Sequence, residues 1–91
     1  MKKIKIKFSP NDIIQSTSGY VYLVISILGA SHDDKWKYVL KPIAIIDYDD
    51  EIELLEDQIL SNISIDIMDR HCQIIRGSLL SKIEKLMIFS S

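Results

Sequence analysis

Hydrophobic and polar residues alternate strictly at the start of the chain. In residues 2–8 (KKIKIKF), Ile4, Ile6 and Phe8 are separated by lysines. This period of two is typical of a strand with one buried face and one charged face exposed to solvent. Outward lysines also protect an edge strand from unwanted pairing. The pattern therefore predicts an edge strand over residues 2–8.

Two longer apolar runs predict the rest of a sheet. Residues 20–28 are rich in Tyr, Val and Ile and apolar on both faces, as in a central strand that is covered on both sides. Residues 36–46 follow a polar segment of hairpin length. They contain Pro42, whose missing amide donor favours an edge or a bulge. We expect a three-stranded antiparallel sheet formed by residues 2–8, 20–28 and 36–46.

The hydrophobic period changes in the second half of the chain. In residues 49–60 (DDEIELLEDQIL), Ile52, Leu55 and Ile59 fall on one helical stripe. Acidic residues fill the first turns, where they complement the helix dipole. This segment is predicted to be an amphipathic helix.

Residues 61–69 fit two patterns, because their isoleucines satisfy both strand alternation and helical spacing. Ser64 as an N-cap and Asp66 in a first turn favour a helix. We expect this helix to run from residue 64 to residue 88, with a bend or interruption at Gly77.

These elements define an α+β fold in which the strands come first and the helices pack afterwards on one face of the sheet. The 91 residues suit a single domain, residues 1–91. The apolar run at 20–30 is shorter than the roughly 20 residues that a membrane-spanning helix needs. We therefore expect no contact with a membrane.

Composition narrows the class of protein. The chain is 47% hydrophobic and 26% charged and has a single cysteine, Cys72, which excludes a disordered chain and a disulfide scaffold. A lone buried thiol favours a cytoplasmic location. Eighteen isoleucines indicate an AT-rich genome, bacterial or phage.

Charge is divided unevenly along the chain. Residues 1–46 hold seven bases and three acids, whereas residues 47–91 hold four bases and ten acids, for a total of −2. No base interrupts the acids between Asp47 and Asp66. Such a run attracts a basic partner or is only a solvated face. The candidate partner-binding residues are Asp49, Asp50, Glu51, Glu53, Glu56 and Asp57.

Motifs of known chemistry are missing from the sequence. It has no G-x-S-x-G, no Gly-rich phosphate loop, no H-E-x-x-H and no C-x-x-C. The acids from Asp47 onward lack the glycine that a calcium loop requires at its sixth position. His32 has no sequence partner for acid–base catalysis, and His71 with Cys72 is too small a set for a metal. We expect no enzyme, no cofactor and no metal.

The C-terminal segment carries more apolar residues than one helix face can bury. A chain of this size also leaves much of its apolar surface exposed unless another chain covers it. We expect a homodimer, or a partner protein, bound through this segment or through the strand at 2–8. The candidate interface residues are Leu79, Ile83, Leu86, Met87 and Phe89.

The function expected from these observations is that of a small non-catalytic regulatory protein, such as an inhibitor, an immunity protein or an accessory subunit. One alternative is a peptide-recognition module, because strands followed by helices resemble the element order of RiPP recognition domains, which take a leader peptide as an added strand. That resemblance covers no motif. A second alternative is weak nucleic-acid binding through Lys2, Lys3, Lys5 and Lys7, which the acidic pI of about 5.6 disfavours.

Overall fold

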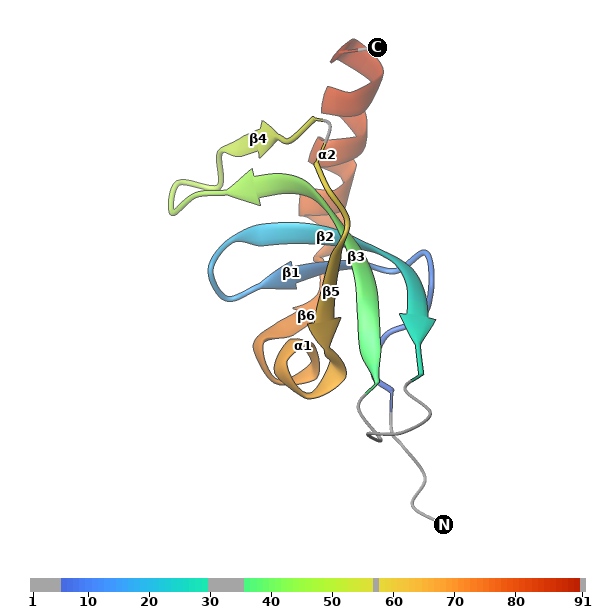
Figure 1. The fold of residues 1–91 in the computed structure, drawn as a ribbon. Coiled ribbons are helices and arrows are strands. Elements are labelled where there is room, and N and C mark those ends of the chain that lie inside the picture. The colour runs from blue at the N-terminus through green and yellow to red at the C-terminus, as the bar shows by residue number, and fades with distance from the viewer. Residues whose placement is uncertain (1–5, 30–35, 57, 91) are drawn as a thin grey trace.

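The computed structural model describes residues 6–29, 36–56 and 58–90. In these ranges the chain forms six strands and two helices (Figure 1). Their order is β1 (Ile13–Ser16), β2 (Tyr20–Leu28), β3 (Lys37–Ile46), β4 (Ile52–Leu54), β5 (Ser61–Ser64), α1 (Ile65–His71), β6 (Cys72–Ile74) and α2 (Gly77–Ser90). No helix in the described part of the chain is long and apolar enough to cross a membrane.

All the strands belong to one antiparallel sheet with the order β4-β3-β2-β1-β6, and β5 also pairs with β3. The long strand β3 carries β5 along its first half and β4 along its second half. The predicted α+β class is confirmed, but the sheet has more strands than the three that were predicted. Short strands added at both sides of the β2–β3 pair account for the difference.

The two central strands match the sequence prediction closely. β2 has the expected bounds of Tyr20–Leu28, and β3 begins one residue later than expected. The register shifts where Tyr22 faces Pro42 and Val21 faces Ala44, so the predicted bulge at the proline is confirmed. Because β3 has neighbours on both sides, it is an interior strand and not an edge.

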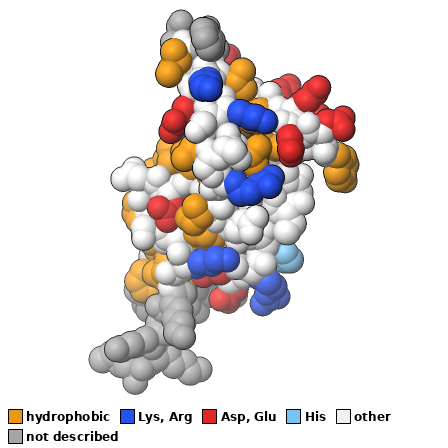
Figure 2. Space-filling model, turned by 180° about the vertical axis from the view of Figure 1, so that it is seen from behind, with side chains coloured by type: hydrophobic (Ala, Val, Ile, Leu, Met, Phe, Trp, Pro, Cys, Tyr) orange, Lys and Arg blue, Asp and Glu red, His pale blue; other side chains and the backbone are white. Residues whose placement is uncertain are grey.

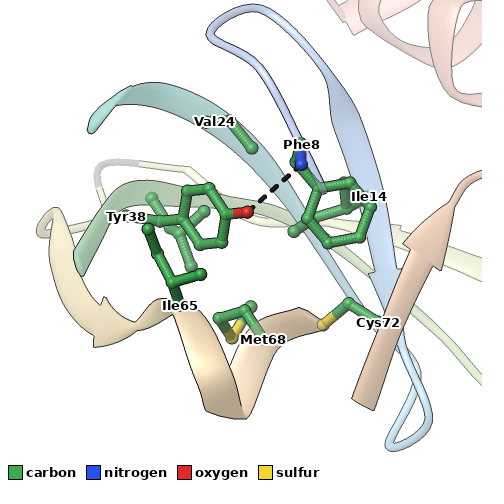
Figure 3. Close-up of a cluster of buried hydrophobic side chains, with 8 residues drawn as sticks. Phe8, Ile14, Val24, Tyr38, Ile65, Met68 and Cys72 are labelled. Atoms are coloured by element: carbon green, nitrogen blue, oxygen red, sulfur yellow. Dashed lines mark hydrogen bonds between the residues drawn. The ribbon is translucent and has the colours of Figure 1, made fainter. Parts of the chain in front are cut away.

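Side chains that alternate along the strands enter two separate cores. Ile14 lies in a cluster with Met68 of α1, whereas its neighbour Ile13 packs against a cluster that includes Leu79 and Ile83 of α2. Adjacent residues of a strand point to opposite faces. The helices therefore cover opposite faces of the sheet, and the prediction that both pack on one face is wrong. Figure 3 shows the first cluster.

The predicted helix over residues 49–60 is wrong. The chain turns after β3 and returns as β4, with Ile46 opposite Ile52 and Ala44 opposite Leu54. Ile52 and Leu54 also alternate with Glu53, so the segment satisfied both periods. Pairing with β3, which lies outside the segment itself, decides in favour of the strand.

The predicted helix over residues 64–88 is present in two pieces. α1 begins just after Ser64, which occupies the N-cap position without a side-chain capping bond. β6 then interrupts the helix by pairing with β1, and α2 starts at Gly77. The interruption was expected at Gly77 but begins five residues earlier, because pairing with β1 extends the chain from Cys72.

The predicted strand over residues 2–8 is not formed by its described part, residues 6–8; residues 1–5 lie outside the described ranges. Phe8 is nevertheless buried. Its amide donates a 3.1 Å hydrogen bond to the Tyr38 hydroxyl (Figure 3). The segment is thus attached to the first core by its side chain and not through a strand ladder.

Candidate protein-interaction surface

The turn between β3 and β4 is held by the side chain of Asp47. Its Oδ1 accepts hydrogen bonds from the amides of Asp49 and Glu51, at 2.9 and 3.0 Å. The amide of Asp50 also donates to the carbonyl oxygen of Asp47, and Asp50 has a left-handed φ of 59°. Aspartate tolerates this conformation better than most residues. These bonds order the turn before any partner arrives.

The structure gathers most of the predicted partner-binding acids on this hairpin. Asp49, Asp50 and Glu51 are exposed in the turn, and Glu53 is exposed on β4. Glu56 is exposed just beyond the strand, and Asp57 lies outside the described residues. Figure 2 shows acidic side chains collected at the upper right, where the hairpin lies. We call Asp47–Glu53 the acidic hairpin. The expected acidic helix is replaced by it.

The turn also presents Tyr48, which sequence reasoning did not select. Its side chain is fully exposed, at 107% of its reference area. A tyrosine on a protein surface is an effective anchor, because it offers a large apolar ring with a hydroxyl group at its end. The available signal was its position between Asp47 and Asp49, inside a polar turn that has no core to pack against.

A groove of about 500 Å³ separates the acidic hairpin from α2. One wall carries Asp50 and Glu51, and the other carries Lys82 and Lys85. The groove is open to solvent, and carboxylates and ammonium groups line it together.

The five predicted interface residues differ in how far they are exposed to solvent. Leu79 and Ile83 are 3% and 1% exposed and belong to the second core of this chain. Leu86 and Met87 are 39% and 41% exposed. The side chain of Phe89 lies outside the described part. The candidate interface on α2 therefore narrows to its last turns.

The remaining sequence candidates are also placed. Cys72 is buried, and this burial raises the pKa of its thiol, as expected for an inert cysteine. His71 beside it is exposed. No three histidine, cysteine or carboxylate side chains of the described residues come close enough to hold a metal ion. His32 lies outside those residues.

The structure also bears on the lysines considered for nucleic-acid binding and on the strand edges considered for peptide binding. Lys2, Lys3 and Lys5 lie outside the described residues, and Lys7 donates to main-chain carbonyls. Residues 36–46 cannot take an added strand, because both edges of β3 are paired.

No protein-family model, curated protein or solved structure matches the chain.

Proposed function

We propose that the chain is a small non-catalytic protein that acts by binding another protein, and that the acidic hairpin contacts a basic surface of this partner. The observation that carries the proposal is the fully exposed Tyr48 within an acidic turn whose backbone is held by the Asp47 carboxylate. An aromatic anchor surrounded by charge combines apolar contact area with electrostatic attraction.

Order in the turn favours binding. Main-chain hydrogen bonds to Asp47 hold the loop in one conformation, so less conformational entropy is lost when a partner binds. The acids themselves guide a basic partner toward the hairpin and raise the association rate. The same acids disfavour a polyanion.

The first experiment captures partners from an extract of the source cells on the immobilised chain. Asp49→Asn/Glu53→Gln removes one aspartate and one glutamate from the hairpin without touching Asp47. Asp66→Asn/Glu84→Gln removes the same two residue types from exposed positions on the helices. A partner retained by the wild type and by the helix variant, but lost by the hairpin variant, supports the proposal. Equal retention by all three proteins contradicts it.

A second copy of the chain is a further proposed partner. The groove beside α2 has an acidic wall and a basic wall, and a two-fold axis would bring the acidic wall of one copy against Lys82 and Lys85 of the other. The exposed Leu86 and Met87 lie on the same helix. A sedimentation mass of twice 10.5 kDa that falls to the monomer mass in Lys82→Glu/Lys85→Glu supports this dimer. A monomer mass for the wild type at high concentration contradicts it.

A further inference from the structure

A polar cleft formed by residues of β1, the end of α1 and β6 has no role in partner binding as proposed above. It measures about 410 Å³ and is lined by Lys7, Gln15, Ser16, Thr17, Arg70, His71, Cys72 and Gln73. Two of these side chains carry a permanent positive charge and none is acidic. Hydroxyl and amide groups supply further hydrogen-bond donors. The lining is thus rich in donors and suited to an anion.

The lysine in the cleft is fixed by the main chain. Nζ of Lys7 donates to the carbonyl oxygens of Cys72 and Asp69, at 3.0 and 3.4 Å. An ammonium group has three donors, so the two carbonyl oxygens do not use them all; Nζ also lies 5.3 Å from the centroid of the Phe8 ring. The carboxylate of Asp69, which does not line the cleft, accepts hydrogen bonds from the Tyr38 hydroxyl and from the Lys7 amide.

The walls of the cleft are joined by backbone bonds. β1 and β6 pair with Ser16 opposite Cys72 and Gln15 opposite Gln73. The amide of Thr17 donates a 3.0 Å hydrogen bond to the carbonyl oxygen of His71. The backbone segments that carry these donors are therefore fixed relative to one another before a ligand binds, which lowers the cost of binding.

We infer that this cleft binds the phosphate group of a small phosphorylated molecule. Arg70 is exposed at the rim, and a guanidinium group matches a phosphate through two parallel hydrogen bonds. Thr17 supplies a hydroxyl group to the lining, and the Ser16 hydroxyl there shares a 2.8 Å hydrogen bond with the Ser18 hydroxyl. The cleft volume lies within the range of small-ligand pockets.

The surroundings favour a small ligand over a nucleic acid. A neighbouring cleft shares Gln15, Ser16 and Thr17 with this one and is lined by Asp47 and Asp50. A strand of several phosphates that extended in this direction would meet carboxylates. A single phosphate that binds between Lys7 and Arg70 does not extend toward Asp47 and Asp50.

Inorganic phosphate is the first probe, titrated into the labelled protein while amide chemical shifts are recorded. Saturable shifts at residues 7, 15–17 and 70–73 are expected, without equal shifts from chloride at the same ionic strength. Arg70→Gln should weaken binding by about tenfold. Arg76→Gln removes an exposed arginine outside the cleft lining and should leave affinity unchanged. Thr17→Val provides a second loss of a donor within the cleft.

A second titration tests which kind of molecule carries the bound phosphate group. It compares a sugar phosphate, its free sugar and a single-stranded oligonucleotide. Binding of the sugar phosphate, without binding of the free sugar, supports the inference. Three results overturn it: no saturable shift with phosphate, equal weakening by Arg70→Gln and Arg76→Gln, or tighter Arg70-dependent binding of the oligonucleotide. None of these results depends on the acidic hairpin, so the proposed partner binding is tested separately.

Discussion

The hydroxyl group of Tyr38 donates a 2.7 Å hydrogen bond to Oδ1 of Asp69. The two residues are 31 positions apart and connect an interior strand of the sheet to α1. The same hydroxyl accepts the amide hydrogen of Phe8, and the other carboxylate oxygen of Asp69 accepts that of Lys7. One tyrosine–aspartate pair therefore ties β3, α1 and the N-terminal segment together.

Tyr38→Phe should lower the free energy of unfolding by about 2 kcal/mol, because the bond to an ionised carboxylate is lost and the Phe8 amide loses its acceptor. Urea denaturation of Tyr38→Phe, Asp69→Ala and the double variant measures the pairwise term. We expect a coupling of about 1–2 kcal/mol. Additive losses would show that the two side chains do not stabilise the fold as a pair.

Alkaline pH should weaken the fold through the same tyrosine. Burial, followed by the hydrogen bond to Asp69, raises the pKa of Tyr38 from 10.0 to about 12. The folded state thus keeps a proton that the unfolded state releases above pH 10. This contribution to stability is complete below pH 10 and is lost as the pH rises toward 12, by on the order of 2 kcal/mol.

The alkaline loss is measured as the difference between wild type and Tyr38→Phe in urea denaturation from pH 9 to about pH 12. Tyr48→Phe is the matched control, since its ring is fully exposed. The wild type and the control should lose stability in parallel, and Tyr38→Phe should lose less. Identical slopes for all three proteins would refute the role of Tyr38.

Gly19 is required by both its conformation and its surroundings. Its φ is +95°, and an added Cβ would overlap the carbonyl oxygen of Ile46. Gly19→Ala should therefore destabilise the protein by about 2 kcal/mol or more. Gly77→Ala is the control, because nothing lies within 4 Å of a Cβ there. Thermal unfolding should show this variant unchanged or more stable by about 0.5–1 kcal/mol.

Leu79 and Ile83 are expected to stabilise the monomer itself. Each forms part of the second core, so truncation to alanine should cost about 2–4 kcal/mol at any protein concentration. Leu86→Ala, at an exposed position, should cost less than about 1 kcal/mol. If Leu79→Ala left monomer stability intact and only weakened self-association, the assignment of Leu79 to the core would be wrong.

Local sequence patterns were sufficient to predict an element where it is long and its apolar residues follow a single period. β2 was predicted with its observed bounds, and the start of α1 after Ser64 was also predicted. Both depend on residues close together in the chain: a run of Val, Ile and Tyr in one case, and a serine before an acidic first turn in the other.

The missed strands depend on partners far away in the chain. β6 forms because Ser16 pairs with Cys72, and nothing within the segment itself shows this contact. Residues 52–54 satisfied both helical and strand periods, and pairing with β3 decided between them. The turn was visible in principle, since Asp47 and the following acids lie between two apolar runs, as in many Asx turns.

The acidic residues of the candidate site were predicted, but the secondary structure that carries them was not. Asp49, Asp50, Glu51 and Glu53 are all exposed on the acidic hairpin, as a charged run predicts. Tyr48 was missed, because exposure of an aromatic residue follows from the turn and not from composition. The polar cleft was missed as well, since its residues come from three segments.

The most direct test of partner binding through the acidic hairpin is the association rate constant of the captured partner at low salt. It is measured for the wild type, Asp49→Asn/Glu53→Gln and Asp66→Asn/Glu84→Gln. The hairpin variant should associate about tenfold more slowly, because electrostatic steering acts mainly on the association rate. The helix variant should match the wild type, and added salt should reduce the difference. Equal association rates for the wild type and the hairpin variant would contradict the central claim.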